Sequence, residues 1–126
     1  MGWKPDRHSA VSPYLVVADP AATLDFAIRV LGGTELLRHT RPDGSIAHAE
    51  VQIDDSVVMV GGAMPGWPAQ PSNVHVYVPD VDTVYAAALD YGAESVQAPA
   101  QKDDPDRRGG IRDQGGTIWW IATHHG

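Results

Sequence analysis

The 126-residue sequence contains no cysteine. Disulfide bonds, thiolate zinc sites and cysteine nucleophiles are therefore excluded. No apolar run approaches the roughly 20 residues that a membrane-spanning helix needs. The first residues, MGWKPDRHSA, also lack the apolar segment of a signal peptide. We therefore expect a cytoplasmic protein.

Basic residues are scarce as well, with 9 Lys and Arg against 16 Asp and Glu and a formal net charge of −7. A surface of this sign repels the phosphate backbone, so we expect neither a nucleic acid nor a membrane as a partner. Apolar residues make up 43% and charged residues 20%, which is the composition of a folded globular chain rather than a disordered one. A chain of this length fits a single domain over residues 1–126.

The first half of the chain predicts a strand, a helix and three further strands. Residues 14–17 (YLVV) are β-branched and aromatic, as in a strand. Asp19 and Pro20 are typical of a helix N-cap and first turn, and they predict a helix over about 20–31. Two turns then separate three strands, at 35–40, 45–53 and 56–60.

The second half repeats this order. It predicts a strand at 73–78, a helix from 80 to about 91 and strands at 95–97, 109–112 and 117–123, with a polar loop at 99–106. Residues 61–72 are dense in Gly and Pro and indicate a linker. We therefore predict an α+β fold of two tandem βαβββ modules, at about 10–62 and 73–124, which form curved mixed sheets around one cavity.

The order and spacing of the motifs resemble the vicinal oxygen chelate superfamily of glyoxalases, bleomycin-resistance proteins and extradiol dioxygenases, in its PhnB-like branch. The resemblance covers almost the whole chain and supports the tandem-module fold. The matching stretches are PYLVVAD at 13–19, VLGG at 30–33, PDG at 42–44, HAEVQI at 48–53, VPDVD at 78–82, YGA at 91–93 and DRRGGIRDQGGTIWWIATH at 106–124.

The resemblance also implies a divalent metal held by His, Gln or Glu side chains from the first and last strands of the modules. In this sequence the implied positions fall on Ser12, Asn73, Trp120 and either Val58 or Met59. A divalent site needs about three strong nitrogen or oxygen ligands, and these side chains do not supply them. We therefore expect no metal ligands and no cofactor.

Strand alternation sorts the remaining candidates. Ala49 and Val51 are apolar and should face a helix, which leaves His48 and Glu50 facing the cavity. In the last strand the same parity places Trp120 in the cavity and Trp119 in the core. The predicted ligand-binding residues are Tyr14, His48, Glu50, Asn73, His75, Tyr77 and Trp120, together with Trp67 from the linker. Aromatic walls with a few polar groups suit a small aromatic ligand.

Several functions remain open at this point. The first is a metal-free binding protein of the bleomycin-resistance kind that sequesters an aromatic antibiotic or metabolite, and the resemblance implies a homodimer. The second is a metal-dependent glyoxalase-like lyase or isomerase that uses His48, Glu50 and His75, with His48 and Glu50 as the candidate catalytic pair. The third is an interaction module with a vestigial pocket.

One charged segment is assigned no role in binding. Aspartates at 103, 104 and 106 lie among Lys102, Arg107, Arg108 and Arg112, and we expect a solvated loop in which these charges neutralise one another. His124 and the residue after it lie near the end of the sequence, where we expect fraying.

Overall fold

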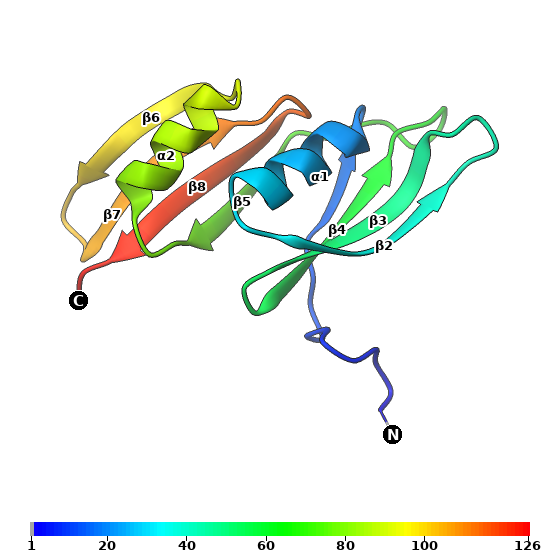
Figure 1. Ribbon diagram of the computed structural model, residues 1–126, viewed down its shortest axis with the longest axis horizontal. Helices are drawn as coiled ribbons and strands as arrows, with labels where there is room; N and C mark the ends of the chain where they lie inside the picture. The colour runs from blue at the N-terminus through cyan, green and yellow to red at the C-terminus, as the bar shows by residue number, and fades with distance from the viewer. Residues whose placement is uncertain (1) are drawn as a thin grey trace. The chain divides into compact units, whose positions relative to one another are not determined.

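The computed structural model describes residues 2–126, and the chain divides into two compact units between Gln70 and Pro71. Each unit is a four-stranded mixed sheet with one helix packed on it (Figure 1). The predicted α+β fold of two βαβββ modules is therefore confirmed. Within residues 2–126, no helix is long and apolar enough to cross a membrane.

The first unit contains one helix and four strands. Its sheet has the order β1-β4-β3-β2, with β1 parallel to β4 and the other neighbours antiparallel. The elements are β1 (Tyr14–Val17), α1 (Pro20–Arg29), β2 (Thr34–Thr40), β3 (Ile46–Ile53) and β4 (Ser56–Gly62).

Local chemistry explains where α1 begins and ends. The Asp19 side chain accepts a hydrogen bond from the Ala22 amide at 3.2 Å, and Pro20 occupies the first turn, as predicted. The helix ends two residues earlier than expected, because Gly32 adopts a left-handed conformation (φ 70°) and the Gly33 amide bonds back to the Ala27 carbonyl.

The second unit has the equivalent topology, β5-β8-β7-β6, with β5 parallel to β8. Pro99, which cannot donate to a ladder, lies where the register of β6 with β7 shifts, so both strands continue past it. The predicted loop at 99–106 is therefore too long, and β7 begins at Asp106 instead of Gly109. The elements are β5 (Ser72–Tyr77), α2 (Val81–Asp90), β6 (Glu94–Gln101), β7 (Asp106–Arg112) and β8 (Thr117–His124).

The core of each unit lies on the face of the sheet that its helix covers. In the first unit Ala49 and Val51 of β3 are fully buried, and in the second unit Trp119 is fully buried. The Trp119 indole donates to the Asp113 carboxylate at 2.8 Å, and Asp113 also accepts the amide of Thr117 in the β7–β8 turn. Alternation then leaves the neighbouring side chains, such as Trp120, on the opposite face.

The linker is more ordered than its composition indicates. Met64 and Trp67 form an isolated antiparallel bridge, with both backbone bonds present at 3.0 and 2.8 Å. This small turn belongs to the first unit.

Candidate functional site

In the first unit, the aromatic ring of Tyr14 lies close against a glycine of the neighbouring strand. A Cβ atom at Gly61 of β4 would lie 2.7 Å from the Tyr14 hydroxyl and 2.9 Å from its ring, so only glycine permits this approach. The Tyr14 side chain remains 47% exposed. The ring of His48 lies beside it, with the centroids 5.7 Å apart.

Glu50 is the buried carboxylate of this face, and it is bound by two histidines. One oxygen accepts a hydrogen bond from His8 Nε2 at 2.6 Å, and the other accepts one from His48 Nε2 at 3.0 Å. Burial acts to raise the pKa of the Glu50 carboxyl, but the bonds from His48 and His8 outweigh it and hold the pKa below its ordinary value. Glu50 is therefore an anion at neutral pH.

A pocket of about 480 Å³ lies on this face. It is lined by residues 3–5 and 8–10 of the N-terminal segment and by Tyr14, Leu37, Glu50 and Met59 of the sheet. Its walls are largely apolar, with the Glu50 carboxylate among them, as is usual for a small-molecule site.

In the second unit, Trp120 also lies close against a glycine of the neighbouring strand. A Cβ atom at Gly110 of β7 would come within 2.6 Å of the Trp120 ring, and the indole Nε1 donates to the Asn73 side chain at 3.0 Å. Trp120 is partly exposed, whereas Trp119 is fully buried, so the prediction that Trp119 is a core residue is confirmed.

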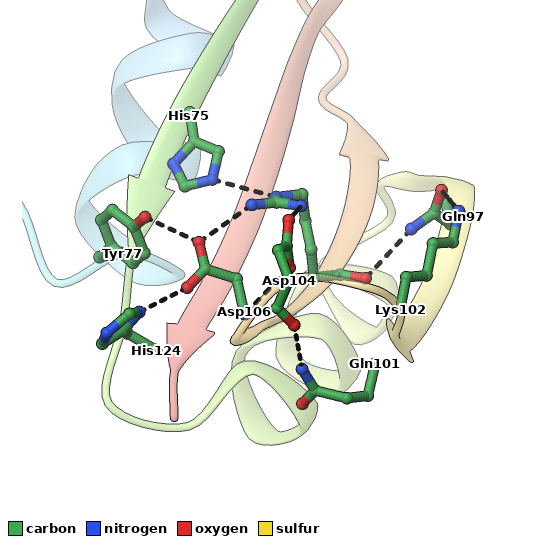
Figure 2. A network of polar contacts seen from close by, with 9 residues as sticks. His75, Tyr77, Gln97, Gln101, Lys102, Asp104, Asp106 and His124 are labelled. Carbon is green, nitrogen blue, oxygen red and sulfur yellow. Dashed lines mark hydrogen bonds and ion pairs between the residues drawn. The ribbon is translucent and has the colours of Figure 1, made fainter. Parts of the chain in front are cut away.

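On the same sheet, a polar network centres on Asp106, which is buried (Figure 2). Its carboxylate accepts hydrogen bonds from the Tyr77 hydroxyl and from His124 Nδ1, both at 2.7 Å, and pairs with Arg108 at 3.0 Å. The bonds from His124 and Tyr77 lower the pKa of the Asp106 carboxyl, and the same contact raises the pKa of the Tyr77 phenol.

Arg108 also fixes the state of His75. Its Nε donates to His75 Nε2 at 3.1 Å, so this nitrogen must present a lone pair and the imidazole is neutral. Burial, with the nearby charge of Arg108, lowers the pKa of His75 accordingly. The His75 ring also contacts the edge of Tyr77, with the centroids 4.8 Å apart.

Two expectations for this segment were wrong. Arg107 and Arg108 belong to strand β7 and not to a solvated loop, although both do pair with carboxylates. His124 lies in β8 and bonds Asp106, so it is part of the network and not of a frayed end.

The predicted ligand-binding residues form one cluster on each unit, and Trp67 belongs to neither cluster. Tyr14, His48 and Glu50 gather on the first unit, and the second unit brings together Asn73 with Trp120 and His75 with Tyr77. Trp67 lies in the linker turn, 51% exposed, and does not line the pocket of the first unit.

The positions at which the resemblance implies metal ligands do not fit a metal. The Asn73 oxygen is occupied by the indole N–H of Trp120, Met59 lines the pocket and Val58 is buried. Across residues 2–126 there is no group of three His, Asp or Glu side chains that could hold a metal ion. The two histidines that bind Glu50 direct their Nε2–H groups at its oxygens instead of converging with them on one point.

Sequence reasoning missed four residues of these clusters, namely His8, Asp106, Arg108 and His124. Extending β7 back from Gly110 in steps of two would have placed Arg108 and Asp106 on the same face of the sheet as Trp120. His8 carried no comparable signal, because it precedes the first strand and contacts a residue 42 positions away.

Comparisons with known proteins agree with the fold. The family model described as the Glyoxalase/Bleomycin resistance protein/Dioxygenase superfamily matches residues 8–121. An uncharacterized protein of Mycobacterium bovis is 33% identical over 124 residues, which covers 90% of this chain and 82% of that protein.

Two solved structures are similar over nearly their whole length. TioX from Micromonospora sp. ML1 is 29% identical with a TM-score of 0.77, and the match covers 92% of this chain and 98% of TioX. TnmS3, described as an antibiotic binding protein from Streptomyces sp. CB03234, shares the fold at 18% identity with a TM-score of 0.70, over 93% of this chain and 99% of TnmS3. The narrower PhnB-like branch stays a prediction. The chain belongs to the glyoxalase/bleomycin resistance protein/dioxygenase superfamily.

Proposed function

We propose that this protein binds a small aromatic ligand, an antibiotic or a metabolite, and sequesters it without a chemical step and without a metal. One observation carries the proposal. Trp120 stands where the superfamily resemblance implies a metal ligand, and its ring is spread over Gly110 and tethered to Asn73. An indole fixed in this way offers a flat face and no ligand for a metal.

Tyr14 supports the same interpretation. Its ring lies over Gly61 and is 47% exposed, so it presents a second flat aromatic surface. A stacked aromatic pair contributes about 0.5 to 1.5 kcal/mol beyond the area it buries. Rings held in place before binding lose little conformational entropy when a ligand stacks on them.

The solved relatives support a binding role. TnmS3, whose fold this chain shares, is described as an antibiotic binding protein. The superfamily resemblance further implies a homodimer, which we include in the proposal. Light scattering should give the mass of two chains, and a monomer mass over a wide concentration range would contradict this part.

The rival, a metal-dependent isomerase or lyase at His48, Glu50 and His75, fits the contacts less well. A metal would need the lone pair of His75 Nε2, which already accepts the Arg108 N–H. The Arg108 guanidinium would also repel a divalent cation at that atom. Both oxygens of Glu50 are occupied by imidazole donors.

The proposal is tested by titrating a panel of flat aromatic compounds by calorimetry, which does not depend on the tryptophans as reporters. Trp120→Ala should weaken the compound that binds best by about 1 to 2 kcal/mol, or roughly tenfold, because one stacking face is lost. Trp120→Phe is the matched control and should retain most of the affinity. A metal-dependent turnover that His48→Ala abolishes would overturn the proposal.

A further inference from the structure

His8 is held in its charged form by its two hydrogen bonds. Its Nε2 faces the Glu50 carboxylate at 2.6 Å, and its Nδ1 faces the Asp6 carbonyl oxygen at 3.1 Å. Both partners only accept, so both ring nitrogens must carry a proton. The pKa of His8 is raised accordingly, first by the Asp6 carbonyl and then by Glu50. His8 and Glu50 therefore form an ion pair, with side chains 11% and 8% exposed.

This ion pair attaches the N-terminal segment, residues 2–10, to the sheet. Every residue of the segment except His8 is exposed, and Trp3 is 83% exposed. A turn from Pro5 to His8 directs the imidazole at Glu50, and Arg7 within it adopts a left-handed conformation (φ 71°) that is unfavourable for a residue with a Cβ. The segment thus has one buried contact and a disfavoured backbone.

The same segment lines part of the pocket of the first unit. Residues 3–5 and 8–10 contribute to the lining, together with the sheet residues Tyr14, Leu37, Glu50 and Met59. A ligand that stacks on Tyr14 and reaches Glu50 would have to replace His8 at the carboxylate. A bare buried carboxylate is costly, so a replacement needs its own charged donor.

We propose that the His8 imidazolium is an internal stand-in for the donor group of the ligand, so that the pocket takes a flat cation with N–H donors, which displaces residues 3–10 from Glu50. This inference rests on the proposed function. It adds the chemical class of the ligand and names His8 as the group that competes with the ligand for Glu50. Lys4, which bonds the His8 carbonyl and would repel a cation, leaves with the displaced segment. His48 remains as the second donor to Glu50.

The test uses two probes of one shape on the full chain. Proflavine is a flat cation with N–H donors, and acridine at slightly alkaline pH is neutral and has none. His8→Ala should bind proflavine about tenfold more tightly than the parent chain, because the competing state is removed. Glu50→Gln should bind proflavine at least about tenfold more weakly, since the anionic anchor is lost. His125 is an exposed histidine of the second unit, and His125→Ala is the matched control. It should leave the affinities for both proflavine and acridine unchanged.

The outcomes separate the two proposals. Proflavine binding that is equal or weaker in His8→Ala would overturn the stand-in role while leaving the binding function intact. If neither proflavine nor any compound of the aromatic panel binds the parent chain or His8→Ala, both proposals are wrong. Acridine should respond little to either substitution, and an equal response of both probes would also overturn the charge argument.

A measurement without ligand provides a second check. Nitrogen relaxation should show residues 3–7 ordered in the parent chain and mobile on the nanosecond timescale in both His8→Ala and Glu50→Gln. Order that persists in either variant would mean that the ion pair does not hold the segment, and this would overturn the displacement step.

Discussion

Replacing each of the two adjacent tryptophans of β8 by alanine should destabilise the protein by very different amounts. Trp119 is fully buried, and its indole N–H donates to the buried Asp113 carboxylate at 2.8 Å. Trp120 is partly exposed, and its N–H donates to Asn73, an exposed side chain. Alternation in the strand therefore separates a core residue from a surface platform within two positions.

The expected magnitudes follow from these environments. Trp119→Ala removes a large core aromatic, which costs about 3 to 5 kcal/mol. It also deprives a buried carboxylate of a donor, which costs about 1 to 3 kcal/mol more. The sum approaches the total stability of a small domain, about 5 to 15 kcal/mol. Trp120→Ala loses only part of a side chain's burial and one exposed hydrogen bond, so we expect about 1 to 2 kcal/mol.

Urea unfolding followed by far-ultraviolet circular dichroism measures both effects without relying on tryptophan emission. Because Trp119→Ala can fail to fold, Trp119→Phe serves as the second variant. Its free energy of unfolding should fall by about 1 to 3 kcal/mol or more, because the hydrogen bond to Asp113 is lost. The reasoning is refuted if Trp120→Ala destabilises the protein as much as Trp119→Ala, since Trp120 would then be a core residue and not a platform.

Two further changes test the glycine contact and the Asp106 network. Gly110→Ala places a Cβ 2.6 Å from the Trp120 ring. It should cost about 1 to 3 kcal/mol of stability and reduce affinity for the compound selected from the aromatic panel, and unchanged affinity by calorimetry would count against the platform. Tyr77→Phe removes a donor to Asp106, whose carboxyl has a pKa below its ordinary value of 3.8. This lowered pKa contributes stability at pH values above 3.8, and the contribution is lost as the pH falls through the folded pKa. The acid unfolding midpoint of this variant should therefore lie at higher pH, and an unchanged midpoint would mean that the bond has no energetic role.

The order of helices and strands, and the sorting of side chains by face, could be predicted because both depend on local rules. Asp19 and Pro20 define the start of α1 by chemistry within one turn. The parity of β8 needs only one known residue to assign Trp119 and Trp120 to opposite faces. Strand ends were less accurate, since the antiparallel partner of β6 carries it past Pro99, where composition alone favours a loop.

The charged clusters could not be predicted, because they depend on pairing across the sheet. Asp106 lies opposite His124 in the β7–β8 ladder, and Arg108 reaches His75 across 33 positions. The mixed charges of residues 102–108 are typical of a solvated loop in the sequence, and only the recognition of strand β7 shows that residues 106–108 are ordered in a sheet. The contact of His8 with Glu50 joins a segment outside the sheet to its buried face, and no periodicity marks it.

In both modules an aromatic ring lies over a strand glycine, but the ring comes from a different strand in each module. Tyr14 pairs with Met59 in β1 and β4, and His75 pairs with Trp120 in β5 and β8, so the aromatic ring is on the first strand in one module and on the last in the other. Each ring nevertheless lies over a strand glycine, Gly61 or Gly110. Since a Cβ at either glycine would push its ring off the sheet, the glycines are as much a part of the proposed binding surface as the rings. An interior strand glycine beside an aromatic residue is thus a signal of close approach that can be looked for in the sequence of such a repeat.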